Sequence, residues 1–193
     1  RHARSPRFRG IRQEAWFDPK SRRADIPRVN LLDDTSWARG LRTIAEQGLI
    51  FELLVWPSQL EQAASILREM PELVVVLEHT GLPYAAPSVA DWSHALAGFF
   101  SAVPSARLKI SALGLSDTTW NPATINPLVH IALDAAGPDR CVLASNYPVE
   151  RPNLRYGQVW DGFAHALEDL SQVERDAVFA VNAAAIYGLS VPN

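Results

Sequence analysis

The stretch that decides the fold is residues 73–83, LVVVLEHTGLP. It opens with a continuous apolar run without polar alternation, which is typical of a central strand of a parallel sheet, buried on both faces. Glu78 and His79 follow directly, and Gly81 and Pro83 then turn the chain. In α/β proteins, titratable side chains that carry the chemistry stand at the carboxyl ends of such strands. Taken alone, His79 is equally compatible with a hydrogen-bonded structural histidine.

Further strands and helices are expected to alternate on both sides of this stretch. The expected strands cover residues 8–13, 49–56, 73–77, 107–111 and 140–145. The expected helices cover residues 36–47, 58–70, 88–103 and 122–136, followed by one around residues 160–167 and one over residues 171–187. Strand–helix order repeated five times, with right-handed crossovers, predicts a parallel sheet covered by helices.

Local signals place the helix starts. Ser36 is expected to cap the first helix, while Ser58 with Glu61, and Ser171 with Glu174, have the spacing of capping boxes. Residues 17–35, rich in Asp, Pro, Arg and Asn, are expected to form a long loop. A loop of that length is either a binding loop or a solvated surface segment.

Two closures of the sheet are open at this point, a doubly wound sheet and a piece of a (β/α)₈ barrel. No glycine-rich phosphate loop follows any expected strand, which disfavours the nucleotide-binding form of the open sheet. A barrel needs eight strands and typically about 250 residues, whereas five strands are expected here.

The composition is that of one globular domain, with 193 residues, 48% of them apolar and 20% charged. A net charge of −3, without Lys/Arg clusters beyond the N-terminus, argues against a nucleic-acid partner. The apolar runs are too short to span a bilayer, so no membrane partner is expected. The single cysteine, Cys141, rules out a disulfide within the chain and agrees with a reducing, cytoplasmic location.

The expected strand ends gather candidate site residues, because carboxyl ends of parallel strands share one edge. They are Arg12, Trp56, His79, Lys109, Ser111, Ser145, Asn146 and Tyr147. A base, two cations and several hydrogen-bonding groups suit an anionic or oxygen-rich small molecule. Arg12 can pair with a carboxylate in a fork, Lys109 can polarise an oxygen, and His79 can move a proton or bind a metal.

These candidates can also have purely structural roles. Lys109 can extend from a strand edge into solvent, Trp56 can belong to the core, and Ser111 can satisfy a backbone group. Other chemistries find less support. There is no G-x-S-x-G motif, Cys141 lies inside an expected strand, and the sequence has no H-x-H, H-E-x-x-H or cysteine-pair metal spacing. The remaining histidines are interpreted as surface or helix-packing residues; they are His2, His94, His130 and His165.

Five segments in this order and spacing resemble one family: FRGIRQ, LEHTGLP, RLKISALG, GPDRCVLASNYPVE and VNAAAIYGL. They resemble the amidohydrolase-related, metal-dependent hydrolases of the TIM-barrel class, and in particular the lactonase-like branch. The resemblance implies an α/β fold, a (β/α)₈ TIM barrel with an H-x-H strand, a histidine on a later strand, and an aspartate after the last. His79 matches the later histidine, and Asn146 stands where many members have the aspartate. No H-x-H strand is present, so residues 1–193 are expected to be a single domain, the C-terminal part of such a barrel.

The resemblance also implies a reaction, in which water attacks an ester or lactone carbonyl of a sugar acid or dicarboxylate. His79 and Asn146 are then the expected catalytic residues, and the expected substrate-binding residues are Arg12, Trp56, Lys109, Ser111 and Tyr147. His79 is also the candidate ligand of one divalent metal ion, zinc or manganese, with a metal-free site as the alternative. Asn146 cannot ionise, so it is neither a general base nor an anionic ligand.

Two alternatives to a lactone hydrolase stay open. One is a decarboxylase or other C–C lyase on the same fold, and the other is a non-catalytic binding or remnant domain. For both enzyme hypotheses, the expected partner is a small-molecule substrate. A homo-oligomer is possible.

Overall fold

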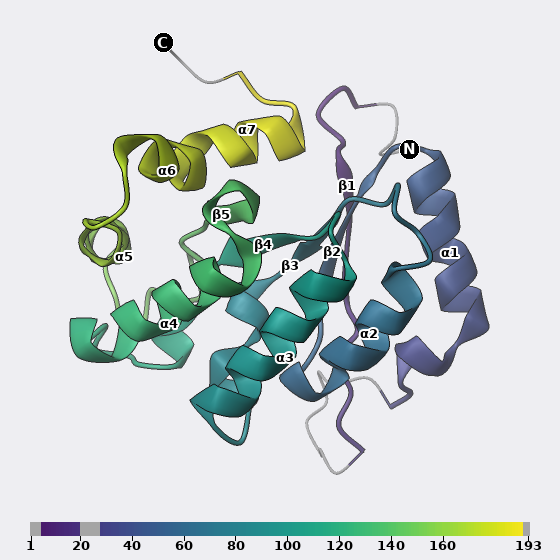
Figure 1. Ribbon diagram of the computed structural model, residues 1–193, viewed down its shortest axis with the longest axis horizontal. Coiled ribbons are helices and arrows are strands. Elements are labelled where there is room, and N and C mark those ends of the chain that lie inside the picture. Colours follow the sequence, from purple (N-terminus) through teal and green to yellow (C-terminus); the bar gives the residue numbers. More distant parts are fainter. Residues whose placement is uncertain (1–4, 20–27, 191–193) are drawn as a thin grey trace.

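A computed structural model describes residues 5–19 and 28–190 (Figure 1). Its centre is a five-stranded sheet in which all neighbouring strands are parallel and follow one another in chain order. The strands are β1 (Gly10–Glu14), β2 (Ile50–Leu54), β3 (Val75–Leu77), β4 (Arg107–Ile110) and β5 (Cys141–Leu143). The predicted α/β fold with a parallel sheet is confirmed. Each of the four later strands is shorter than the residue range predicted for it.

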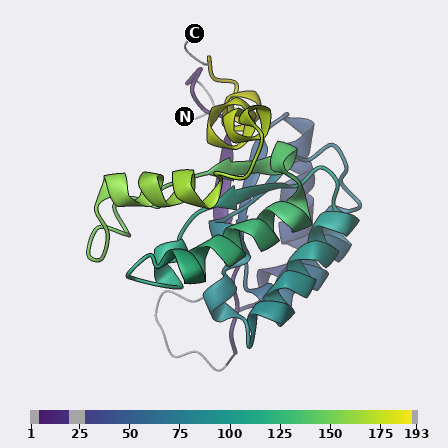
Figure 2. The same cartoon turned by 60° about the vertical axis from the view of Figure 1, so that its left-hand side comes forward.

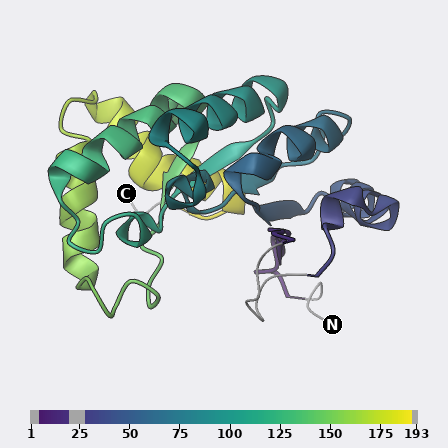
Figure 3. The same ribbon diagram turned by 90° about the horizontal axis from the view of Figure 1, so that it is seen from below.

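Seven α-helices accompany the sheet in the described part of the chain. They are α1 (Thr35–Glu46), α2 (Leu60–Leu67), α3 (Val89–Ala102), α4 (Pro122–Ala136), α5 (Tyr156–Ala166), α6 (Gln172–Asp176) and α7 (Asn182–Tyr187). Helices α1 to α4 lie side by side along one face of the sheet, as the view from below shows (Figure 3). Helix α5 lies alongside α4 (Figure 2). None of the described helices is long and apolar enough to cross a membrane.

The two faces of the sheet bury different side chains. On the helix-covered face, strand residues such as Phe51, Leu77 and Ile110 belong to one continuous hydrophobic core. The opposite face is also buried, with Val76 and Val142 fully enclosed, but these residues stand outside that core. Because side chains alternate along a strand, this second face also receives the charged residues of the strands.

Helix α7 reaches the second face because both of its ends are anchored. At its start, Asn182 Nδ2 donates to the carbonyl oxygens of Pro138 and Cys141, each at 2.8 Å. At its end, Arg9 Nε donates to the carbonyl oxygen of Tyr187 at 2.6 Å. A five-residue π-helical segment, Ala177–Val181, joins α6 to α7. The helix predicted over residues 171–187 is thus one continuous helical run that leads from β5 back toward β1.

Two predicted helix starts were wrong. Asp34, and not Ser36, caps α1, because the Asp34 carboxylate accepts the Ser36 N–H at 2.7 Å. Ser58 does not open α2 with a capping box. The buried Gln59 side chain instead accepts the N–H of Trp56 at 3.2 Å, which produces a 3₁₀ turn before the helix begins at Leu60.

Other predicted starts are confirmed. Ser88, the first residue of the helix expected over residues 88–103, caps α3, and Ser171 with Glu174 forms a capping box at α6. The loop expected over residues 17–35 contains a 3₁₀ turn, Leu31–Asp33, while its residues 20–27 lie outside the described part. His2 also lies outside it.

Candidate functional site

Three strand ends share an uncommon backbone conformation. His79 after β3, Ala112 after β4 and Asn146 after β5 all have positive φ, at 55°, 60° and 53°. Residues other than glycine enter this left-handed region at a cost of roughly 1–2 kcal/mol. Such strained residues cluster at functional sites, where the surrounding structure holds them in place. The carboxyl edge of β3, β4 and β5 is therefore the first candidate for the site.

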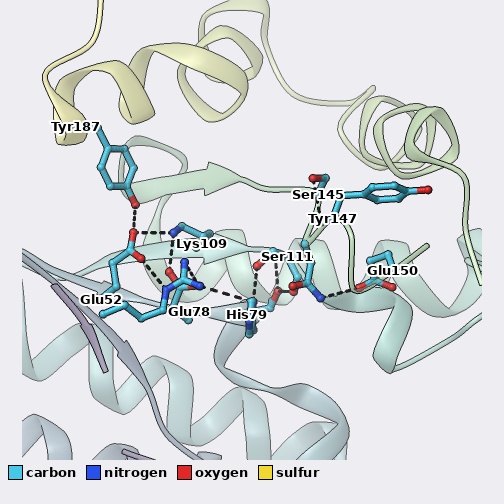
Figure 4. A network of polar contacts seen from close by, with 12 residues as sticks. Glu52, Glu78, His79, Lys109, Ser111, Ser145, Tyr147, Glu150 and Tyr187 are labelled. Atoms are coloured by element: carbon cyan, nitrogen blue, oxygen red, sulfur yellow. Dashed lines mark hydrogen bonds and ion pairs between the residues drawn. The ribbon is translucent and has the colours of Figure 1, made fainter. Parts of the chain in front are cut away.

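His79 is held at this edge by the loop after β4. Its Nδ1 lies 3.0 Å from the Ser111 hydroxyl (Figure 4). The neighbouring Thr80 hydroxyl donates to the Ser111 carbonyl at 2.8 Å and accepts the Ser111 N–H at 3.0 Å. Trp92 Nε1 in turn donates to the Thr80 carbonyl at 2.9 Å. Thr80 and Ser111 are almost fully buried, so the imidazole is fixed in orientation and reaches solvent only in part.

Next to His79 lies an ionic cluster, on the face of the sheet away from α1–α4. It consists of Arg12, Glu52, Glu78, Lys109 and Tyr187. Lys109 Nζ lies 2.6 Å from Glu78 and 2.8 Å from Glu52, and Arg12 Nε lies 2.8 Å from Glu52. Arg12 Nη2 is 3.2 Å from Glu78 Oε2 but without hydrogen-bond geometry. Tyr187 donates to Glu52 at 2.6 Å from helix α7. Two cations and two carboxylates make the cluster electrically neutral.

The cluster shifts the pKa values of its members. Burial acts to raise the pKa of Glu52, but hydrogen bonds from Lys109 and Tyr187 outweigh it and lower the pKa to about 2. Burial acts to lower the pKa of Lys109, but the Glu78 and Glu52 carboxylates raise it above its ordinary value. Burial, helped by the negative charge of Glu52, raises the pKa of Glu78 against the pull of Lys109.

His79 stands at the end of this cluster and is neutral at pH 7. Burial, followed by the positive charges of Arg12 and Lys109, lowers its pKa to about 4. When Nδ1 carries the proton and donates to Ser111, Nε2 is left as a free acceptor. The arrangement therefore presents a neutral, oriented imidazole that can take up a proton.

On the other side of His79 and Ser111 lies the turn after β5 (Figure 4). Asn146 Nδ2 donates to Glu150 Oε1 at 3.2 Å. Tyr147 uses its hydroxyl to bond the Leu154 carbonyl at 2.9 Å, and its ring packs edge-on against Tyr156. Ser145 accepts the Tyr147 N–H at 3.2 Å. The side chains of this turn are thus held mainly by one another.

Trp56 occupies a separate position. Its ring stacks on Trp16 with centroids 5.0 Å apart. It borders a cavity of about 350 Å³ that Phe17, Asp18 and Ser58 also line. No hydrogen bond links Trp56 to the ionic cluster among the described residues.

The structure thus joins the predicted residues in part. His79 contacts Ser111, and Arg12 and Lys109 share the same two carboxylates, while Trp56 stands apart. Four residues that the sequence did not assign to the site contribute to it: Glu52, Glu78, Glu150 and Tyr187. A signal was available for the first two, since a charge inside an apolar run is buried only when it is paired.

The described residues do not by themselves fit a metal ion. They contain no group of three or more His, Cys, Asp or Glu side chains placed to hold one. Glu78 already binds Lys109, and His79 Nδ1 already faces Ser111. This leaves His79 Nε2 as a single atom that could bind a metal, whereas zinc sites in proteins use three or four protein ligands.

Comparisons with known proteins agree on one family. The amidohydrolase family model matches residues 1–189. The uncharacterized protein y4mH of Sinorhizobium fredii is 32% identical over 187 residues, which cover 96% of this chain and 63% of that protein. An L-fucono-1,5-lactonase of Burkholderia multivorans is 28% identical over 203 residues, covering 98% of this chain and 66% of the lactonase.

A solved structure of an amidohydrolase also matches this chain. An amidohydrolase of Burkholderia multivorans, crystallised with bound zinc, superposes with a TM-score of 0.80 at 26% identity, covering 97% of this chain and 66% of that one. The chain thus spans somewhat less than two thirds of the length of these relatives. By the match over nearly its whole length, the chain belongs to the amidohydrolase family.

Proposed function

We propose that this chain is the larger part of a hydrolase that opens a lactone or related cyclic ester of a sugar acid or dicarboxylate. The observation that carries the proposal is the partly buried His79 imidazole, held by Ser111 at the strained carboxyl edge of the sheet. The 28% identity to an L-fucono-1,5-lactonase over 98% of the chain supports the substrate class.

In the proposed reaction, a water molecule attacks the lactone carbonyl carbon and gives one proton to His79 Nε2. The ring C–O bond then breaks, and the leaving alkoxide takes the proton back from His79 Nε2, which completes the hydroxy acid and restores the neutral imidazole. During the attack, the Ser111 hydroxyl accepts a hydrogen bond from the proton on Nδ1, in the tautomer that leaves Nε2 free to accept from the water. Asn146 orients the water or a substrate hydroxyl through its amide.

The substrate-binding residues have graded roles in this proposal. Arg12 keeps 49% of its side chain exposed, so its guanidinium is available to an anionic substrate even while it pairs with Glu52. Lys109 is bound on two sides by carboxylates, and it acts through the charge it places near His79. Trp56, which follows β2, and Tyr147, which follows β5, are proposed to contact the substrate from their loops.

We further propose that the five strands are part of a (β/α)₈ barrel. Strict chain order of five parallel strands, with α1–α4 along one face, is the arrangement of a barrel segment. The ionic cluster then lies in the barrel interior. Zinc bound to a related structure supports metal chemistry in the complete enzyme. The described residues offer that metal His79 alone, so no step is assigned to it.

The test is lactone hydrolysis by the purified protein, with and without added Zn²⁺ or Mn²⁺. L-Fucono-1,5-lactone and other sugar-acid and dicarboxylate lactones are followed by acid release. His79→Gln is expected to lower kcat by about 10²-fold or more. His94→Gln, on the exposed side of α3, is the matched control and is expected to keep wild-type kcat/KM.

Two results would overturn the proposal. One is that no lactone is hydrolysed under any of these conditions, and the other is that His79→Gln hydrolyses the accepted lactone at the wild-type rate. Release of CO₂ from a hydroxybenzoate, without lactone hydrolysis, would establish the decarboxylase alternative instead.

A further inference from the structure

Glu150 is a buried carboxyl group that the proposed reaction does not use. It is 1% exposed, and the residues before and after it in the turn are half-buried or exposed. Its Oε1 accepts a hydrogen bond from Asn146 Nδ2 at 3.2 Å, while its Oε2 is buried without a hydrogen-bond partner among the described residues. Burying a carboxyl group with only one hydrogen-bonded oxygen costs free energy of folding. Such a group in a folded protein therefore calls for an explanation.

The backbone brings Glu150 under Asn146. The left-handed conformation of Asn146 starts a tight turn, in which the Asn146 carbonyl accepts the N–H of Val149 at 2.9 Å and that of Glu150 at 3.4 Å. One turn of chain therefore separates the two side chains. The Glu150 carbonyl then accepts the N–H of Leu154 at 2.9 Å, which closes the next turn.

The loop after β4 leaves room for this carboxyl group. Gly114 faces Glu150, and a Cβ at Gly114 would stand only 2.8 Å from Glu150 Cδ and 2.9 Å from a methyl group of Leu154. Gly114 has an ordinary φ, so space and not backbone conformation requires glycine here. The pocket for Glu150 thus involves the loops after both β4 and β5.

We propose that Glu150 is the positioning residue for Asn146: its carboxylate holds the Nδ2 amide and so presents the Asn146 Oδ1 carbonyl to the site. A carboxylate only accepts hydrogen bonds, so it selects the amide orientation in which Nδ2 faces it. A protonated carboxyl group can donate and loses that selection. Burial raises the pKa of Glu150, so this change falls above the ordinary range for a glutamate.

The side-chain hydrogen bond of Glu150 among the described residues comes from Asn146, whose amide does not titrate. Gly114 on the loop after β4 faces the same carboxyl group. No ion pair joins Glu150 to a described residue. His79, beside this turn, also titrates, so the pH-dependent change that Glu150→Gln abolishes is the part that reports on Glu150. The presentation of Oδ1 to a substrate rests on the proposed function, whereas the orientation of the amide does not.

The first test is nuclear magnetic resonance of the Asn146 side-chain NH₂ group, assigned with Asn146→Asp. In the wild type, its resonances are expected to move with pH, with a midpoint above the ordinary glutamate range. Glu150→Gln does not titrate and, like the protonated acid, can both accept and donate, so it is expected to abolish the pH dependence and to leave the resonances near their low-pH position. Glu150→Leu removes the acceptor and is expected to shift the resonances at every pH. Unchanged resonances in Glu150→Leu, or an undiminished titration in Glu150→Gln, would overturn the proposal.

The second test uses the lactone accepted by the wild type. Glu150→Leu is expected to lower kcat by about 10- to 100-fold with little change in KM, because a misplaced group costs rate more than binding. Glu150→Gln, which keeps an acceptor oxygen but can also donate, is expected to recover only part of that loss. A Glu150→Leu enzyme with wild-type kcat refutes the positioning role even where its stability falls. If no lactone is hydrolysed, the proposed function fails, and the resonance test still decides the orientation of Asn146.

Discussion

Lys109 on β4 and Glu78 at the end of β3 face one another with 2.6 Å between Nζ and Oε1, on the face of the sheet opposite α1–α4. The Glu78 side chain is 1% exposed and that of Lys109 is 11% exposed. Replacing such a buried pair as a whole by apolar residues is often tolerated, whereas removing one partner leaves an uncompensated charge. The Lys109 ammonium also binds Glu52. Without it, the carboxylates of Glu52 and Glu78 repel each other with no cation between them.

Lys109→Met is therefore expected to lower the free energy of unfolding by about 3–5 kcal/mol at pH 7. Urea denaturation followed by circular dichroism measures this loss. Arg68→Met is the matched control, because Arg68 pairs with Glu69 at 3.6 Å on the exposed surface of the protein. The control is expected to change stability by less than about 0.5 kcal/mol. Equal effects of the two substitutions would show that the ionic cluster contributes no more than a surface pair.

Glu52 makes the stability of the fold depend on acid. Its pKa is about 2 in the folded protein and 4.5 as its ordinary value. The unfolded chain therefore binds a proton first, and the stabilisation present above pH 4.5 is lost as the pH falls toward 2. Glu52→Gln is expected to be less stable at pH 7 and to lose less stability across that interval. Chemical denaturation at a series of pH values measures the slope.

Tyr187→Phe supplies a second variant for the same question. It removes one hydrogen bond to Glu52 and leaves Lys109 and Arg12 in place, so the folded-state pKa of Glu52 is expected to rise, and the acid loss is expected to be smaller and to end at a higher pH than in the wild type. An unchanged pH profile in both variants would contradict the assignment of this transition to Glu52.

The order of elements could be predicted from the sequence, because unbroken apolar runs and helical periodicity depend on local composition. The run around residues 73–77 contains β3, and each other predicted strand overlaps an observed one. Helix starts were predicted less well. Gln59 is committed to Trp56 and to the carbonyl of Ala15, 44 residues earlier, and this tertiary contact displaces the capping box expected at Ser58.

The site was predicted by position but not by pairing. The strand ends located His79, Lys109 and Ser111 correctly relative to the sheet, because the carboxyl ends of parallel strands share an edge. Their partners depend on register and on the path of the last helix. Tyr187 lies 135 residues from Glu52, and no local pattern connects the two. The ion pairs of Lys109 therefore cannot be predicted from local sequence and are seen only in the folded structure.

His79 is expected to stay neutral far below the ordinary range of histidine. Its pKa is about 4 in the folded protein against 6.5 as the ordinary value, so stability associated with it is present above pH 6.5 and lost as the pH falls toward 4. Ring resonances assigned with His79→Gln measure the titration directly. Lys109→Met and Arg12→Met each remove a positive charge near the ring and are expected to raise this pKa, provided the variants fold. A His79 midpoint near 6.5 in the wild type would contradict the buried environment.

The last prediction concerns two glycines on exposed or half-exposed helix faces that the sequence does not distinguish. A Cβ at Gly162 in α5 would overlap the indole ring of Trp120, which also packs edge-on against Phe163 with ring centroids 5.2 Å apart. Gly98 in α3 has open space around its missing Cβ. Gly162→Ala is expected to destabilise the protein by about 1–3 kcal/mol through overpacking.

Gly98→Ala is expected to stabilise the protein by about 0.5–1 kcal/mol, because alanine restricts the unfolded chain and favours the helix. Thermal and urea denaturation of both variants measure whether each substitution raises or lowers the free energy of unfolding. The clash at Gly162 requires Trp120 to be present, so Trp120→Ala combined with Gly162→Ala is expected to cost less than the sum of the two single changes. Additive costs, or two glycine variants with the same sign, would show that Trp120 does not pack against α5 as described.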